Sequence, residues 1–164
     1  MAGTKTLRTN ALALRSAASA RRSARAAIAL DVLDGHLGYF IRRVQVWIFQ
    51  DFIRTLAGVD LSPAQFSVLA VIGANRGLSQ AEIGATLAIE RARLARLLHR
   101  LEARCLVQRL RSSADSRRYA LQLTAQGRTL LGRAKVLAAR HERRLMGRLG
   151  PERHTMLLRA LRDF

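Results

Sequence analysis

The chain has 164 residues, of which 29 are Lys or Arg and 11 are Asp or Glu, so its formal net charge is +18. This basic excess indicates a polyanionic partner, nucleic acid before an anionic membrane surface. The single cysteine excludes an internal disulfide and a cysteine-based zinc site, and no apolar run approaches the roughly 20 residues of a membrane span. We therefore expect one cytoplasmic, nucleoid-associated domain with no membrane partner, no cofactor and no metal.

Residues 1–29 form a basic arm that contains no acid. Ala, Ser and Thr dominate the arm and large apolar residues are few, which is typical of a segment that is disordered or becomes helical only when docked. Arginines interrupt its apolar stretch, so we do not interpret it as a signal peptide. We expect the arm to dock on a partner subunit or to contact DNA phosphates.

Residues 30–57 are predicted to form one long helix. Apolar residues recur at spacings of three and four from Leu30 to Trp47, and Ile41, Ile48 and Phe52 widen the apolar face. A face this wide favours packing against both its own domain and a second subunit. Gly58 is predicted to end the helix.

Three shorter helices follow. Ser62 and Pro63 begin a helix that runs to about Ala74, with Ser as the N-cap and Pro in the first position. Ser79 begins a helix over 79–87, with the Glu of a capping box three residues later. A third helix is predicted over 91–104, and the spacing of the three suits a helix-turn-helix unit.

A hairpin comes next, with strands at 106–111 and 119–123 and a tip at 112–118. The strand from Tyr119 alternates, so Tyr119, Leu121 and Leu123 are expected to share the buried face. A long helix over 124–149 ends at Gly150, and a last helix covers 152–163. The predicted fold class is therefore mainly α with a small β-hairpin wing, a winged helix-turn-helix with a helical dimerisation region.

The third helix is the candidate recognition helix. Its predicted core face consists of Leu94, Leu97, Leu98 and Leu101. Its opposite face is small and basic, with Ala92, Arg93 and Arg96 expected to reach base edges and His99 and Arg100 expected to contact phosphates. Glu90 and Glu102 are expected to project away from that face. The alternative is a solvated charged face, which the preceding helices, the hairpin and the net charge make less favourable.

The hairpin tip carries Asp115, Arg117 and Arg118. Arginines at a wing tip are placed to contact a phosphate backbone, and Asp115 is expected to orient one of them through a charge-assisted hydrogen bond. The alternative for Asp115 is an ordinary turn residue.

These pieces together resemble the MarR family of bacterial transcription regulators. The resemblance rests on LSPAQFSVLAVI, on LSQAEIGATLAIERARLARLLHRLEARCLVQR, on the D-x-R turn at Asp115 and Arg117, and on ALQLTAQGRTLL. It covers about residues 33–164. It implies a MarR-type domain over 30–164, with the winged helix-turn-helix at 61–123 and dimerisation helices at 30–57 and 124–164.

The resemblance also implies a homodimer that binds an inverted-repeat operator in double-stranded DNA and represses until a small effector binds. It places Arg117 in the minor groove and gives Asp115 a supporting role. Two departures stand out: Ala92 and Arg93 replace the Ser and Thr of many relatives, and Cys105 stands where many have Gly, at a position that favours a left-handed residue. Either Cys105 adopts that conformation at a cost of about 1 kcal/mol, or the turn differs from that of the relatives. Base preference therefore cannot be transferred from the family.

The family's effector pocket lies beside the long first helix, where this chain supplies His36, Tyr39, Arg43 and Trp47. Aromatic and cationic groups suit an aromatic carboxylate, a phenolic compound or an acyl-CoA thioester. The alternative is that the aromatic residues belong to the dimer core and the arginines are solvated.

Two other classes of function compete with a regulator. An architectural, largely non-specific DNA-binding protein would need the charge but no operator. An enzyme is disfavoured because the four histidines are scattered and the chain has no metal-ligand spacing and no phosphate loop.

Overall fold

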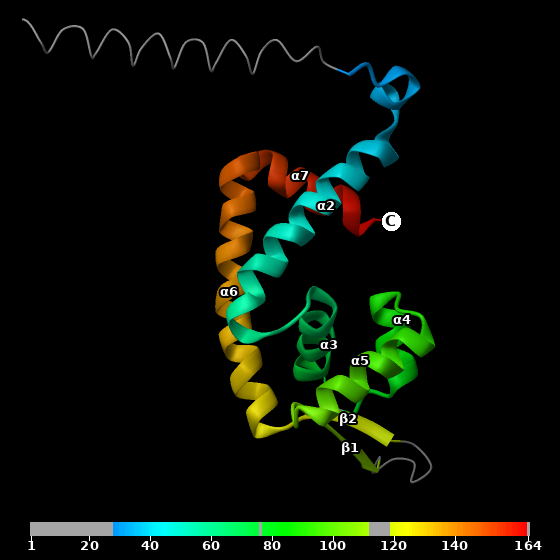
Figure 1. Ribbon diagram of the computed structural model, residues 1–164, viewed down its shortest axis with the longest axis vertical. Helices are drawn as coiled ribbons and strands as arrows, with labels where there is room; N and C mark the ends of the chain where they lie inside the picture. The colour runs from blue at the N-terminus through cyan, green and yellow to red at the C-terminus, as the bar shows by residue number, and fades with distance from the viewer. Residues whose placement is uncertain (1–27, 76, 112–118, 164) are drawn as a thin grey trace, which may run out of the picture. The chain divides into compact units, whose positions relative to one another are not determined.

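The computed structural model describes residues 28–75, 77–111 and 119–163. The chain divides into two compact units, Met1–Arg42 and Arg43–Phe164. In the first unit the described part comprises a 3-10 turn, η1 (Asp31–Gly35), and the beginning of α2 (Leu37–Leu56). The second unit contains the rest of α2 and all the elements that follow it (Figure 1).

The predicted helix over 30–57 is wrong at its N-terminal end. His36 is extended, with φ −96° and ψ 110°, and it separates η1 from α2. Asp31 has a left-handed φ of 51°. Asp34 and Gly35 are weak helix formers, which explains why the α-helix begins only at Leu37. At the other end a 3-10 turn, η2 (Ala57–Val59), follows α2, so Gly58 lies within that turn and does not itself end the helix.

The predicted starts of the two helices that follow α2 are confirmed. Helix α3 (Pro63–Ala74) is capped by Ser62, and α4 (Gln80–Leu87) is capped by Ser79. In both helices the N-cap hydroxyl accepts from the third backbone N–H while Gln65 or Glu82 accepts from the N-cap N–H. The capping box therefore fixes both starts through local hydrogen bonds alone.

The hairpin consists of β1 (Val107–Arg111) and β2 (Tyr119–Leu123), which are antiparallel with Val107 opposite Leu123 and Arg111 opposite Tyr119. The predicted alternation of burial along β2 is wrong at its first two residues. Tyr119 is 54% exposed and Ala120 is buried, because Tyr119 belongs to the last pair of the ladder, beyond the core. On the other edge of β2, the Leu121 N–H donates to the Leu78 carbonyl, which joins the hairpin to the start of α4.

Helix α5 (Arg91–Ala103) ends in a left-handed residue. Cys105 has φ 53°, and the N–H groups of Cys105 and Leu106 donate to the carbonyls of Glu102 and Leu101. This is a Schellman ending, which usually takes glycine. A cysteine in this conformation costs about 1 kcal/mol.

The long helix α6 (Ala125–Leu149) is capped by Thr124, whose hydroxyl accepts from the Gly127 N–H and donates to the Cys105 carbonyl. A Cβ on Gly127 would lie 2.0 Å from the Leu106 carbonyl oxygen, so only glycine allows α6 to begin this close to the hairpin. Gly150 separates α6 from α7 (Pro151–Arg162). At this junction His154 contacts Glu142 with an Nε2–Oε1 distance of 2.5 Å.

The core of the second unit is a set of leucines, isoleucines and valines from every element between the end of α2 and α6. Its largest fully buried members are Leu56, Val68, Leu69, Ile83, Leu94, Leu98, Leu101, Leu106 and Leu121. They fix α5 against α3, α4 and the hairpin, so the outer face of α5 is held on a packed scaffold. Among the described residues no single helix is long and apolar enough to cross a membrane, and one pair passes together only across a 70° bend.

Candidate DNA-binding interface

Helix α5 divides into a core face and a solvent face, as the sequence predicts. Leu94, Leu98 and Leu101 are buried, and Leu97 is partly buried against the same core. The five predicted DNA-contacting residues of this helix are all exposed: Ala92, Arg93, Arg96, His99 and Arg100. The cations therefore form a basic surface beside one small residue, which suits phosphate contact and guanine recognition.

The start of α5 is capped by Glu90. Its carboxylate accepts hydrogen bonds from the Ala92 N–H at 2.8 Å and the Arg93 N–H at 3.0 Å. These two bonds lower the pKa of Glu90, and the charge of Arg96 lowers it further. Glu90 is therefore the N-cap, which sequence reasoning missed because Ser, Thr, Asp and Asn are the preferred residues there.

Glu102, the other acid of α5, pairs with Arg109 of β1 at a distance of 2.6 Å. This contact ties the end of α5 to the wing. Arg104 donates to the Asp60 carbonyl oxygen at 2.5 Å, which ties the same end to the loop before α3. The predicted wing residues Asp115, Arg117 and Arg118 lie outside the described residues.

A groove of about 410 Å³ lies between α2, the start of α3 and the solvent face of α5. Phe49 and Ile53 supply its apolar wall. Arg93, Arg96 and Arg100 supply cations from the predicted DNA-contacting face, and none of them makes an ion pair within the described ranges. The groove thus joins an aromatic surface to positive charge on the candidate recognition helix. Sequence periodicity assigned Phe49 and Ile53 to no site, so this groove was missed.

The four predicted effector-binding residues have separate surroundings. His36 is exposed at the end of η1, and the ring of Tyr39 lies against that of Phe40 with centroids 5.3 Å apart. Arg43 is exposed, and Trp47 is half-buried beneath the Arg148 guanidinium, 4.6 Å from the ring centroid. Neither Arg43 nor Trp47 lines the groove between α2 and α5.

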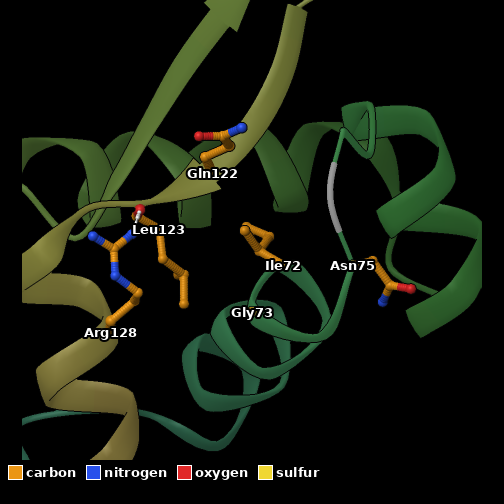
Figure 2. Close-up of a pocket in the computed structure, with 6 residues that line it drawn as sticks. All are labelled: Ile72, Gly73, Asn75, Gln122, Leu123 and Arg128. Carbon is orange, nitrogen blue, oxygen red and sulfur yellow. Dashed lines mark hydrogen bonds between the residues drawn. The ribbon is translucent and has the colours of Figure 1, made fainter.

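A second hollow, of about 390 Å³, lies at the base of the wing between the end of α3, β2 and the start of α6 (Figure 2). Asn75, Gln122 and Arg128 give it a polar lining. Arg128 donates to the Leu123 carbonyl at 2.8 Å and Asn75 donates to the Val71 carbonyl at 2.9 Å. None of the described residues that line this hollow is aromatic, so it suits an aromatic ligand less well than the groove between α2 and α5 does.

Helices α2 and α6 are joined by a cluster of charges around Asp51. One carboxylate oxygen, Oδ2, lies 2.8 Å from His141 Nδ1 and accepts from Arg144 at 2.8 Å. The hydrogen bond from Arg144, followed by that from His141, lowers the pKa of Asp51 to about 2. His141 is buried and its ring also contacts Phe52. The cluster fixes α2 against α6 on one side while Phe49 and Ile53 line the groove on another.

Within the described part of the chain, no group of three or more His, Cys, Asp or Glu side chains is arranged to hold a metal ion.

Known proteins resemble this chain in sequence and in fold. The profile of the MarR family matches residues 59–118. The transcriptional regulator HosA of Escherichia coli is 31% identical over 103 residues, which are 63% of this chain and 76% of HosA.

Solved structures extend the similarity to most of the chain. The transcriptional repressor CouR bound to a 23-mer DNA duplex has a TM-score of 0.79 and 44% identity, over 83% of this chain and 96% of CouR. CouR bound to p-coumaroyl-CoA has a TM-score of 0.76 and 44% identity, over 82% of this chain and 94% of CouR. PcaV from Streptomyces coelicolor, solved with its natural ligand, has a TM-score of 0.68 and 26% identity, over 84% of this chain and 95% of PcaV.

Proposed function

The chain belongs to the MarR family of winged helix-turn-helix DNA-binding transcription regulators, which are not enzymes, and from that premise we propose that it is a repressor released by a small effector. The observation that carries the proposal is the exposed basic face of α5 on a rigid core. Ala92, Arg93 and Arg96 lie in the N-terminal half of α5, where helix-turn-helix proteins contact base edges. His99 and Arg100 stand further along, where phosphate contact is expected.

The wing completes the proposed DNA contact. Arg117 is assigned to the minor groove and Arg118 to a phosphate, with Asp115 orienting Arg117. Residues 61–123 then carry DNA recognition. The basic arm at 1–29 adds either phosphate contacts or a dock on the partner subunit.

The operator is an inverted repeat because the protein acts as a two-fold dimer, with 30–57 and 124–164 as its dimerisation segments. Helix α7 supports this proposal, since none of its twelve residues is buried within the single chain. Leu157, Leu158 and Leu161 are 46%, 41% and 56% exposed. A second copy covering these leucines and the half-buried Leu145 and Leu149 would remove them from water. Light scattering at micromolar concentration should give about twice the chain mass of 18.2 kDa, and a single-chain mass would refute the dimer.

The effector is proposed to be an aromatic carboxylate, a phenolic compound or a CoA thioester. The groove between α2 and α5 offers Phe49 for the ring and Arg93, Arg96 and Arg100 for the anion. An effector that occupies these arginines competes directly with DNA for them. Effector contact by His36, Tyr39, Arg43 and Trp47 stays a separate prediction, because Arg43 and Trp47 do not line this groove. The structure of CouR with p-coumaroyl-CoA supports the chemical class.

The net charge of +18 also suits an architectural protein that binds DNA without an operator. To separate the two functions, the full chain should be used to select duplexes from a pool with a randomised centre. A repressor enriches an inverted repeat, whereas an architectural protein enriches no motif. The selected duplex should then be released by p-coumaroyl-CoA but not by free CoA. Retention of the duplex at saturating p-coumaroyl-CoA would refute the CoA-thioester assignment and leave the DNA-binding role intact.

A further inference from the structure

Glu90 places a carboxylate at the N-terminus of α5. Its two oxygens accept from the Ala92 and Arg93 N–H groups, at 2.8 and 3.0 Å. These are two of the residues proposed to contact bases. The side chain is exposed, so the carboxylate lies at the surface beside these residues and is held there by two hydrogen bonds.

Glutamate is an unusual N-cap in this chain. Three other helices, α3, α4 and α6, are capped by the hydroxyls of Ser62, Ser79 and Thr124. A hydroxyl also caps a helix and carries no charge. Glu90 accepts two backbone N–H bonds, but at a surface that approaches phosphates its carboxylate is repelled. A hydroxyl cap would avoid this repulsion, so the acid has a cost for DNA binding that a further role would offset.

A carboxylate in the major groove distinguishes base edges. It accepts hydrogen bonds from the amino groups of cytosine N4 and adenine N6, and it is repelled by the acceptor edges of guanine and thymine. Two carboxylate oxygens offer about four lone-pair sites, so two remain after the backbone N–H groups of Ala92 and Arg93 are satisfied. The backbone bonds fix its direction, which keeps the entropy cost of such a contact low.

We propose that Glu90 is a specificity-determining residue, which selects a base pair presenting an amino group and rejects acceptor edges at that position. The inference rests on the proposed docking of α5 in the major groove. Glu90 would thereby complement Arg93 and Arg96, whose guanidinium groups suit guanine acceptors. Its negative charge also weakens binding to unselected DNA, which offsets part of the large positive charge of the protein.

The test compares full-length wild type with Glu90→Gln, Glu90→Ser and Glu82→Gln. Gln keeps the shape of the side chain and removes its charge, and Ser restores an uncharged N-cap. Glu82 provides the matched control, because it is also an acid at a helix start and Gln preserves its capping box with Ser79. Each protein should be used to select from the randomised duplex pool, followed by Kd measurements on the wild-type motif and its single-base-pair variants. Thermal unfolding should confirm that each variant is folded.

We expect both Glu90 variants to lose about 5- to 100-fold of discrimination at one base pair per half-site, and to bind motif-free DNA several-fold more tightly. Glu82→Gln should leave the motif unchanged. The inference is overturned if the Glu90 variants keep the wild-type motif, if every position weakens equally, or if Glu82→Gln gives the same change. A wild-type selection without any motif would instead overturn the proposed sequence-specific function, and the role of Glu90 with it.

Discussion

Asp51 of α2 and His141 of α6 are joined across 90 residues of sequence by a contact of 2.8 Å between Oδ2 and Nδ1. Arg144 donates to the same oxygen and to the Thr55 hydroxyl. The Asp51 side chain is 18% exposed and the His141 side chain is 6% exposed. The cluster joins α2, which lines the groove, to α6 through one buried histidine and an arginine that is 48% exposed.

Asp51→Asn should lower the free energy of unfolding by about 2–3 kcal/mol, because it leaves the Arg144 cation without its carboxylate. Urea denaturation measures the change. Asp60→Asn is the matched control: the Asp60 side chain is 94% exposed and 3.5 Å from Arg104. Asn also tolerates the left-handed backbone of residue 60. If both variants lose the same free energy of unfolding, the cluster around Asp51 contributes no more to stability than the exposed ion pair of Asp60.

The Asp51 contribution should depend on pH in a defined window. Because its pKa is lowered from 3.8 to about 2 in the folded state, its stabilisation is fully present above pH 3.8 and is lost as the pH falls toward 2. The shift corresponds to about 2 kcal/mol. The difference in unfolding free energy between wild type and Asp51→Asn should therefore shrink as the pH is lowered from 5 to 2. A difference that stays constant over this range would contradict the lowered pKa.

Two glycines of α6 should respond in opposite directions to alanine. Gly127→Ala places a Cβ 2.0 Å from the Leu106 carbonyl oxygen, so α6 and the hairpin must separate, at a cost of about 3 kcal/mol or more. A Cβ on Gly132 would meet nothing within 4 Å, and Gly132→Ala should stabilise the helix by about 0.5–1 kcal/mol. Thermal unfolding of the two variants measures both changes in stability, and it distinguishes the steric effect at residue 127 from the helix propensity at residue 132. Equal effects would refute the close approach at Gly127.

Arg96 and Arg117 should affect DNA binding differently. Arg96→Ala is expected to relax discrimination at one or two base pairs by about 1–3 kcal/mol each. Arg117→Ala should weaken binding to every operator by about 1.5–3 kcal/mol, since minor-groove contacts depend on groove width and charge more than on base identity. Fluorescence anisotropy on matched duplexes measures both, and Arg140→Ala on the exposed surface of α6 controls for the loss of one charge.

Asp115→Ala tests the orienting role at the wing. Loss of an acid favours DNA electrostatically, whereas loss of the orienting bond should weaken binding as Arg117→Ala does. Tighter binding by Asp115→Ala would show that long-range charge dominates. Weaker binding, with little added loss in the double variant, would show that Asp115 and Arg117 act as one unit.

Local chemistry made much of the fold predictable. Ser62, Ser79 and Thr124 start their helices through bonds to residues three positions away, and Gly150 with Pro151 ends α6. The leucine periodicity of α5 likewise identified its core face and its exposed cations. The sequence left two turns open after α5, and the structure shows the left-handed one at Cys105.

The remaining features depend on tertiary contacts that no local pattern contains. Apolar spacing extended the first helix back to Leu30, although Asp31 and His36 interrupt it. The contact between Asp51 and His141 and the pairing of Leu121 with Leu78 join segments far apart in sequence. The groove beside α5 likewise forms only because the fold places Phe49 and Arg96 on the same surface.

Sequence-specific binding is measured by the ratio of Kd values for the selected inverted-repeat duplex and a shuffled duplex of the same composition. Both should be measured by anisotropy at several salt concentrations around physiological ionic strength. Affinity for both duplexes should fall with salt, because both make phosphate contacts. A sequence-specific repressor should keep a preference of about 10³-fold or more at physiological salt. A ratio near one would refute sequence-specific repression and assign the protein to charge-driven, non-specific DNA binding.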